Sequence, residues 1–185
     1  MKKSILASVI ALGMVSGLAQ AAGNEVQFVG SVVATTCDLE ASGTGSDAGL
    51  VKNIIELGQT KINTPGKEVT FAFKPVNNAQ NQQNQQNCEQ LAGSNSKVVL
   101  TWNSNAFDGQ NGLGAISGAA SDAFVTVQAL NADTNNNVVM LTSGDSQEFA
   151  AAKLASDGLQ YKAQLVGKTQ PGDFQTASKF TVHYK

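Results

Sequence analysis

One stretch near the N-terminus decides the fold: Val26-Gln27-Phe28-Val29-Gly30-Ser31-Val32-Val33-Ala34-Thr35-Thr36-Cys37. Its apolar or small residues fall at every second position from 26 to 34, which is the period at which a β-strand places side chains on one face. Short apolar runs separated by turn residues follow it along the chain. The pattern predicts a strand at the start of an all-β domain.

The residues before this stretch have the composition of an export signal. Met1-Lys2-Lys3 is followed by an apolar run from Ile5 to Leu18 and then by Ala19-Gln20-Ala21. A positive start, a short hydrophobic core and an A-x-A site are typical of a cleaved signal peptide. We therefore expect residues 1–21 to direct export and to be removed. The alternative, an uncleaved membrane anchor, is less favoured because the run is short for a membrane span.

The residues after the stretch alternate between strand patterns and turns. Pro-Gly, Asp-Gly and Asn-Gly pairs separate the strand candidates. So many short strands with this punctuation predict a β-sandwich. One segment, Glu148–Leu154, is rich in Ala and is also compatible with a helical turn. The predicted strands are Asn53–Leu57, Val69–Phe73, Val98–Trp102, Phe124–Leu130, Val138–Leu141, Gln147–Lys153, Leu159–Val166 and Lys179–Tyr184.

Cys37 and Cys88 are the two cysteines of the chain. In an exported protein an even number of cysteines predicts a disulfide. Two free thiols are the alternative, and the spacing is too wide for a redox motif of the C-x-x-C type. We therefore expect a structural bridge from the N-terminal strand to the middle of the chain.

Two segments read as loops. Residues 41–49 consist of small and polar residues, from which we expect no contribution to the core. Residues 77–87 are almost entirely Asn and Gln and end at Cys88. We expect a solvated loop there, with an exposed interaction loop as the alternative; its role cannot be read from the sequence.

Composition excludes some classes of function. The 12 basic residues are all Lys, and charged residues make up 14% of the chain. Nucleic-acid binding needs clustered cations, and base recognition favours Arg, so we expect no nucleic-acid partner. The chain also holds 16 Asn and 16 Gln. It is expected to be a neutral, amide-rich domain.

Three places in the sequence carry residue types found in catalytic, calcium-binding or sugar-binding sites. His183 alternates with Val182 and Tyr184 in the last strand, so we expect it to face solvent rather than act as a base. Asp133–Asn137 resembles the start of a calcium loop but lacks the Gly and Glu that an EF-hand requires, which leaves only a loose Ca²⁺ site open. Trp102 is expected in the core, with a sugar-binding face as the alternative. No catalytic constellation, metal site or cofactor is predicted.

The order of these features resembles the chaperone–usher fimbrial subunits. Their opening is similar to Val26–Cys37, with an alternating apolar strand, a Gly and then a Cys. Ile55-Glu56-Leu57-Gly58 resembles a later strand of the family, Cys88 falls where the second Cys is expected, and Phe180–Lys185 resembles the final strand with its penultimate Tyr. The resemblance covers the whole chain after the signal peptide.

The resemblance implies an immunoglobulin-like sandwich that lacks its last strand and is completed by donor-strand exchange. It implies a donor segment at residues 22–32, with Val26, Phe28, Gly30 and Val32 entering a neighbour's groove, and a sandwich domain at residues 33–185. Gly30 corresponds to a small residue where the groove is shallow. The groove, and the strand that pairs with the chaperone, are implied to involve Phe180, Val182 and Tyr184, with the Lys185 carboxylate held by the chaperone.

The implied partners are identical or related fimbrial subunits, a periplasmic chaperone and an outer-membrane usher. The implied location is a fimbria on the cell surface, reached through the periplasm. The leading expectation is a structural, polymerising subunit that supports adhesion. The alternatives are a minor or adhesive subunit that binds a host glycan or protein receptor, and an exported monomeric carbohydrate-binding domain. An enzyme is least favoured.

Overall fold

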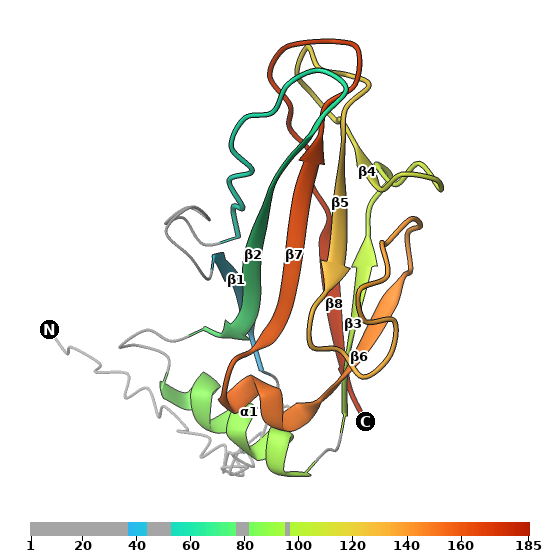
Figure 1. The fold of residues 1–185 in the computed structure, drawn as a ribbon. Coiled ribbons are helices and arrows are strands. Elements are labelled where there is room, and N and C mark those ends of the chain that lie inside the picture. The colour runs from blue at the N-terminus through green and yellow to red at the C-terminus, as the bar shows by residue number, and fades with distance from the viewer. Residues whose placement is uncertain (1–36, 44–52, 77–81, 95–96) are drawn as a thin grey trace, which may run out of the picture. The chain divides into compact units, whose positions relative to one another are not determined.

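The computed structural model describes residues 37–43, 53–76, 82–94 and 97–185, all within the compact unit Ala34–Lys185. The described residues form two antiparallel β-sheets with one α-helix and one 3-10 helix (Figure 1). The first sheet has the order β1-β2-β7-β5-β4 and the second the order β6-β3-β8. The elements are β1 (Leu39–Gly43), β2 (Pro65–Pro75), α1 (Gln82–Ser94), β3 (Lys97–Asn103), β4 (Leu113–Gly114), β5 (Phe124–Ala129), β6 (Ser146–Ala150), η1 (Ala151–Ala155), β7 (Leu159–Val166) and β8 (Lys179–Tyr184).

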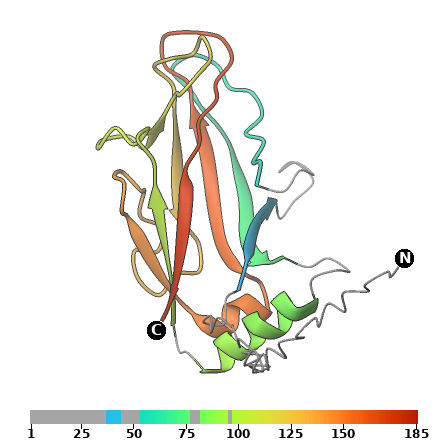
Figure 2. The ribbon, with the colours of Figure 1, turned by 180° about the vertical axis from the view of Figure 1, so that it is seen from behind.

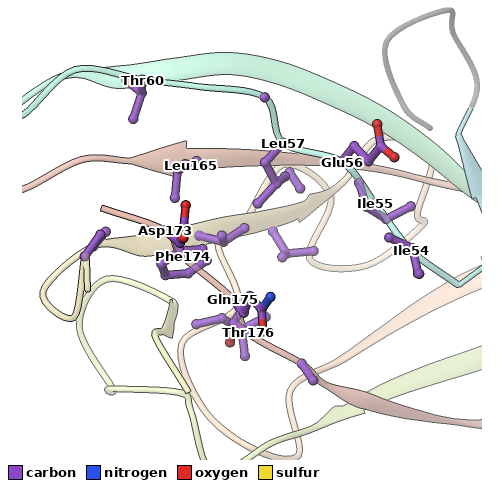
Figure 3. A pocket seen from close by; sticks show the side chains of 18 of the residues that line it. Ile54, Ile55, Glu56, Leu57, Thr60, Leu165, Asp173, Phe174, Gln175 and Thr176 are labelled. Atoms are coloured by element: carbon purple, nitrogen blue, oxygen red, sulfur yellow. The ribbon is translucent and has the colours of Figure 1, made fainter. Parts of the chain in front are cut away.

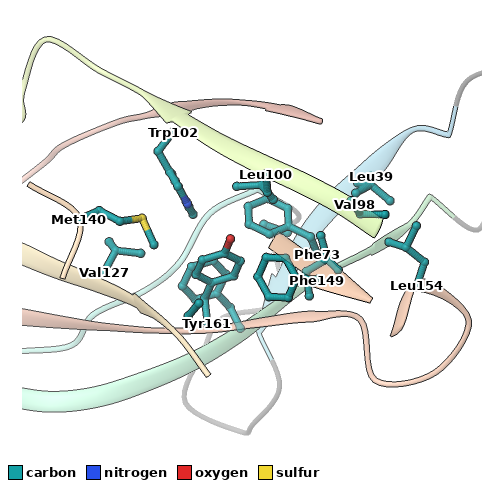
Figure 4. Close-up of a cluster of buried hydrophobic side chains, with 14 of the residues drawn as sticks. Leu39, Phe73, Val98, Leu100, Trp102, Val127, Met140, Phe149, Leu154 and Tyr161 are labelled. Atoms are coloured by element: carbon teal, nitrogen blue, oxygen red, sulfur yellow. The ribbon is translucent and has the colours of Figure 1, made fainter. Parts of the chain in front are cut away.

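The core lies between the two sheets and is built on aromatic side chains (Figure 4). Tyr161 and Phe149 are fully buried, and their ring centroids lie 5.6 Å apart. Phe73 and Trp102 pack edge to face at the same distance of 5.6 Å. Tyr161 donates a hydrogen bond to Gln147 Oε1 at 3.1 Å, and burial raises the pKa of its hydroxyl. Trp102 is thus a core residue, as expected.

Alternation predicted the strands best where one face packs on this core. β7 and β8 have the predicted bounds, and β3 shows a strict alternation of buried and half-buried residues. Segment Gln147–Lys153 divides between both interpretations, because β6 ends at Ala150 and η1 begins at Ala151. The prediction of an all-β sandwich is confirmed.

Two predicted strands are wrong. Asn53–Leu57 is extended but pairs with no strand of the described chain. Val138–Leu141 forms only an isolated bridge between Val139 and Gln128, because Asn135 and Asn137 just before it adopt positive φ angles that turn the chain. Residues 41–43, expected in a loop, belong to β1, where Ala41 is buried.

The amide-rich segment is also different from the prediction. Residues 82–87 open helix α1 rather than forming a loop. Gln83 bonds Asn87 and Gln85 bonds Glu89, pairs that stabilise a helix at the i, i+4 spacing. The helix is fixed from outside by its packing on η1 and by the disulfide at Cys88. No helix in the part of the chain that is described is long and apolar enough to cross a membrane.

The disulfide prediction is confirmed. Cys37 and Cys88 are bonded with their Cα atoms 4.8 Å apart, and both residues are buried. Next to the bridge, buried Asn84 accepts a hydrogen bond from the Asp38 N–H at 2.7 Å and donates to the Asp38 carbonyl at 3.0 Å. One helix therefore holds the start of the described chain by a covalent bond and by a paired amide.

Candidate functional site

A groove with a volume of about 1340 Å³ opens along one side of the sandwich (Figure 3). Its floor is the aromatic and aliphatic core, including Phe71, Phe73 and Val127. One wall is the extended segment 53–62 and the other is the segment 170–178 that leads into β8. The groove thus reaches the core side chains of Phe71, Phe73 and Val127, whose exposed fractions are 3%, 1% and 4%.

The first wall, segment 53–62, is an extended chain that forms few backbone hydrogen bonds with the rest of the described chain. No backbone hydrogen bond joins residues 54–61 to any other described residue. The wall is fixed only at its ends, where the Asn53 N–H bonds the Ala41 carbonyl at 2.8 Å and the Asn63 N–H bonds the Lys168 carbonyl at 3.0 Å. Both asparagines adopt positive φ, a conformation that Asn tolerates better than most residues. Ile55 and Leu57 of this wall pack on the core.

The second wall is held by a neighbouring loop. The Gln175 N–H and carbonyl bond Ser117, and the Ala120 N–H bonds the Asp173 carbonyl at 3.1 Å. Gly118, at φ +103°, is required here because a Cβ would collide with the Asp173 carbonyl. The Asp122 carboxylate accepts hydrogen bonds from the Thr169 hydroxyl and N–H, and these bonds lower its pKa. This wall is therefore rigidly placed.

β8 continues the second wall and is an edge strand. It pairs with β3 on one side, and within the second sheet no described strand lies on its other side (Figure 2). Its half-buried residues alternate with exposed ones, and His183 is exposed, as expected. The groove is thus flanked by two stretches of extended chain: segment 54–61, which forms no backbone hydrogen bond with the rest of the described chain, and β8, whose outer edge no described strand pairs.

The residues predicted for the groove lie on β8, but not all of them line it. Phe180 lines the groove, and its ring centroid lies 4.5 Å from that of Phe73. Val182 and Tyr184 pack against the core beyond the end of the groove. The Tyr184 hydroxyl donates to the Cys37 carbonyl at 3.4 Å, and burial raises its pKa to about 12.

Lys185 lies beyond β8 and is fixed by the neighbouring strands. Its backbone exchanges two hydrogen bonds with Lys97, and its ammonium group lies 3.4 Å from Glu148 Oε2. The predicted donor residues Val26, Phe28, Gly30 and Val32 lie outside the described residues.

In the loop Asp133–Asn137, where the sequence left a calcium site open, the Asp133 carboxylate forms ion pairs with lysines. Asp133 lies 2.6 Å from the Lys97 ammonium and 3.1 Å from that of Lys153, and both lower its pKa. Two cations already neutralise this group. In the described ranges, no three His, Cys, Asp or Glu side chains gather as a metal site would require.

Sequence reasoning missed the residues of both walls. Asn53–Leu57 was predicted as a strand, yet its consecutive apolar pair Ile54-Ile55 departs from strict alternation. Phe174, Thr176 and Ser178 continue the inward alternation of β8 toward the N-terminus. Because this set mixes polar and apolar residues, the sequence pattern did not indicate it.

Comparison with known proteins adds to this geometry. No family model matches the chain. The F107 fimbrial protein of Escherichia coli is 33% identical over 185 residues, which is 100% of both proteins. A crystal structure of the P pilus rod subunit PapA aligns with a TM-score of 0.49 and 19% identity, covering 87% of this chain and 99% of that one. Because the similarity to the F107 protein extends over the full length of both sequences, this chain belongs to the family of fimbrial proteins.

Proposed function

We propose that this chain is a structural subunit of a bacterial surface fimbria and that it polymerises by exchanging a strand with neighbouring subunits. The observation that carries the proposal is the groove. It reaches the apolar core between segment 54–61, which forms no backbone hydrogen bond with any other described residue, and the outer edge of β8, along which no described strand lies. An added strand between segment 54–61 and β8 would satisfy backbone groups on both sides and cover the floor. The family membership supports the same function. An adhesive subunit is not favoured.

The occupant that fits is the N-terminal segment 22–32 of a second copy or of a related subunit. Val26, Phe28, Gly30 and Val32 share one face of an extended strand, and that face suits an apolar floor. Burying such an aliphatic or aromatic side chain contributes roughly 1.5–3 kcal/mol by the transfer estimate. Several together form a large part of the stability of a small domain.

An unfilled groove is a hazard before assembly. A free strand edge beside an open apolar groove is a template for aggregation, so the subunit requires a temporary partner. A periplasmic chaperone would lend a strand along β8, with Phe180, Val182 and Tyr184 on the paired strand and the Lys185 carboxylate as its anchor. An outer-membrane usher would then bring the donor segment of the next subunit.

The domain organisation follows from this route. Residues 1–21 would direct export and be removed, residues 22–32 would be lent to a neighbour, and residues 33–185 would form the sandwich. The subunit would pass through the periplasm to the cell surface and contribute to adhesion there as part of the fibre. The many uncharged amides would keep stacked copies hydrated without repulsion between like charges.

The test is assembly by full chains that differ only in the donor segment. Deletion of residues 22–29 should abolish fibres, measured by electron microscopy and sedimentation, while the truncated chain still co-purifies with its chaperone. Gly30→Leu should block assembly because the larger side chain does not fit a shallow groove. Ser31→Leu, on the opposite face of the same strand, is the matched control and should assemble. Normal fibres from the deletion variant would refute the proposal.

A further inference from the structure

The turn that leads into β4 contains the one Asn-Gly pair of the sequence, Asn111-Gly112 (Figure 1). An Asn followed by Gly is the pair at which Asn loses its side-chain amide most readily. The backbone nitrogen of the Gly attacks the Asn Cγ, and Gly has no side chain to obstruct the approach. Gly112 is required here, because its φ is +142° and a Cβ would collide with the Val125 carbonyl oxygen. The turn is thus built on a chemically labile pair.

The carboxylate of Asp108 binds both groups that take part in this reaction. Its Oδ1 accepts a hydrogen bond from the Gly112 N–H at 3.1 Å, and its Oδ2 accepts one from Asn111 Nδ2 at 2.7 Å. Oδ1 also accepts the backbone N–H groups of Gln110 and Asn111. Burial alone would raise the pKa of Asp108, but these hydrogen bonds lower it below its ordinary value of 3.8. The group is therefore an anion at neutral pH.

These contacts oppose the reaction in two ways. The Gly112 nitrogen must release its hydrogen bond before it can turn toward the Asn111 Cγ, and Asn111 Nδ2 must leave its bond to Oδ2. The attack also places negative charge on the side-chain oxygen of Asn111, and a carboxylate beside that oxygen repels the charge. Both effects raise the barrier to attack.

We propose that Asn111 is a latent deamidation site and that Asp108 suppresses its reaction in the folded chain. In the reaction a bond forms between the Gly112 nitrogen and the Asn111 Cγ, and the bond from Cγ to Nδ2 breaks. The amide group leaves as ammonia and carries away the proton of the Gly112 N–H, which leaves a cyclic succinimide. Water then opens the ring to aspartate or to isoaspartate.

The products would alter the chain next to a residue of the groove. Leu113 follows the pair directly, is buried, lines the groove and pairs with Val125 of β5. Either product places a second carboxylate beside that of Asp108. Isoaspartate also adds a methylene group to the backbone immediately before β4. Suppression of the reaction therefore preserves the position of Leu113.

The test follows residue 111 in the folded full chain at mildly alkaline pH, by peptide mapping with mass spectrometry. Asp108→Ala should deamidate about tenfold faster than the wild type, the factor that corresponds to one lost hydrogen bond to a charged group. Asp108→Ser should react at an intermediate rate, because a Ser hydroxyl still accepts backbone N–H groups but carries no charge. Asp133→Ser, which removes a carboxylate from another loop, is the matched control and should react as the wild type does.

Denaturant separates protection by the fold from the intrinsic reactivity of the pair. In guanidinium chloride the wild type and Asp108→Ala should deamidate at the same high rate, because the contacts of the turn are lost. Isoaspartate should accompany aspartate at position 111, since a succinimide opens to both. A wild type that reacts as fast when folded as when unfolded would overturn the proposal.

The role of Asp108 has its own decisive outcome. Asp108→Ala, with its fold checked by circular dichroism, would overturn that role if it reacted at the wild-type rate. A slower reaction than that of the wild type would show that the carboxylate acts as a base on the Gly112 N–H, which also contradicts the proposal. Asp108→Ser provides the same comparison should Asp108→Ala not fold.

Discussion

The base of the sandwich and its groove differ in how their polar groups are hydrogen-bonded. At the base, which we define as Cys37, Asp38, α1 and η1, polar groups find partners within the chain. The disulfide and the Asn84 amide fix the first described residues, and Leu154 of η1 is buried. Along the groove, the backbone of segment 54–61 and the Thr176 hydroxyl have no hydrogen-bond partner among the described residues. The difference teaches that the described chain satisfies its polar groups at one end and leaves an open groove along one side, where the proposed function places a partner.

The largest expected effect comes from opening the base. Replacing both Cys37 and Cys88 with Ala should lower the free energy of unfolding by about 4 kcal/mol, the chain-entropy estimate for a loop of roughly 50 residues. Guanidinium unfolding followed by tryptophan fluorescence measures the change. A reductant is the control, since it should destabilise the wild type but not the variant. Equal free energies of unfolding for the variant and the oxidised wild type would contradict the idea that the disulfide stabilises the base.

A matched pair of leucines compares the two regions directly. Leu154→Ala at the base should cost about 2–5 kcal/mol in the monomer, because the side chain is buried among fixed neighbours. Leu57→Ala on the groove wall should cost the monomer less, because that residue is only half-buried. In the fibre an added strand would cover Leu57, so its replacement should then lower the denaturant midpoint of disassembly. Equal losses of unfolding free energy for the two variants in the monomer would contradict the difference in packing between the base and the groove wall.

The smallest effect concerns the ion pairs near the base. The Lys97 and Lys153 ammonium groups hold the pKa of Asp133 below its ordinary value of 3.8. A carboxylate whose pKa is lower in the folded state stabilises that state above the unfolded pKa, and the contribution is lost as the pH falls through the folded value. Between pH about 5 and about 2 the wild type should therefore lose more stability than Asp133→Asn.

Salt provides the control for this prediction. The ion pairs are partly exposed, so molar salt should screen them and narrow the difference between the two proteins. Thermal melts over this pH range measure both effects. Parallel pH profiles at low salt would show that Asp133 contributes nothing.

Local periodicity explains how much of the fold could be predicted. β7 and β8 were found with their full bounds because each presents alternating residues to a core, and that alternation is written in the sequence. Helix α1 was missed because a run of Asn and Gln carries no apolar stripe. It is held by the disulfide, by Asn84 and by its packing on η1, which are contacts between distant parts of the chain.

The groove also shows what local sequence patterns cannot predict. Phe180 lines it, whereas Asn53–Leu57, which was predicted as a strand, is extended but pairs with no described strand. The apolar residues at Ile54, Ile55 and Leu57 indicate burial but cannot indicate a missing neighbour. Whether an extended chain has a pairing partner depends on the rest of the sheet.

The sequence by itself determined the all-β class, the alternating apolar positions of residues 26–32 and the pairing of two cysteines. These depend on residue spacing and on the redox chemistry of exported proteins, which are properties of the chain alone. Only the tertiary structure decided that α1 fixes the base, and that the backbone of residues 54–61 and the buried Thr176 hydroxyl have no partner within the described ranges. Hydrogen-bond satisfaction and burial are sums over distant neighbours, so they are settled only when the two sheets come together.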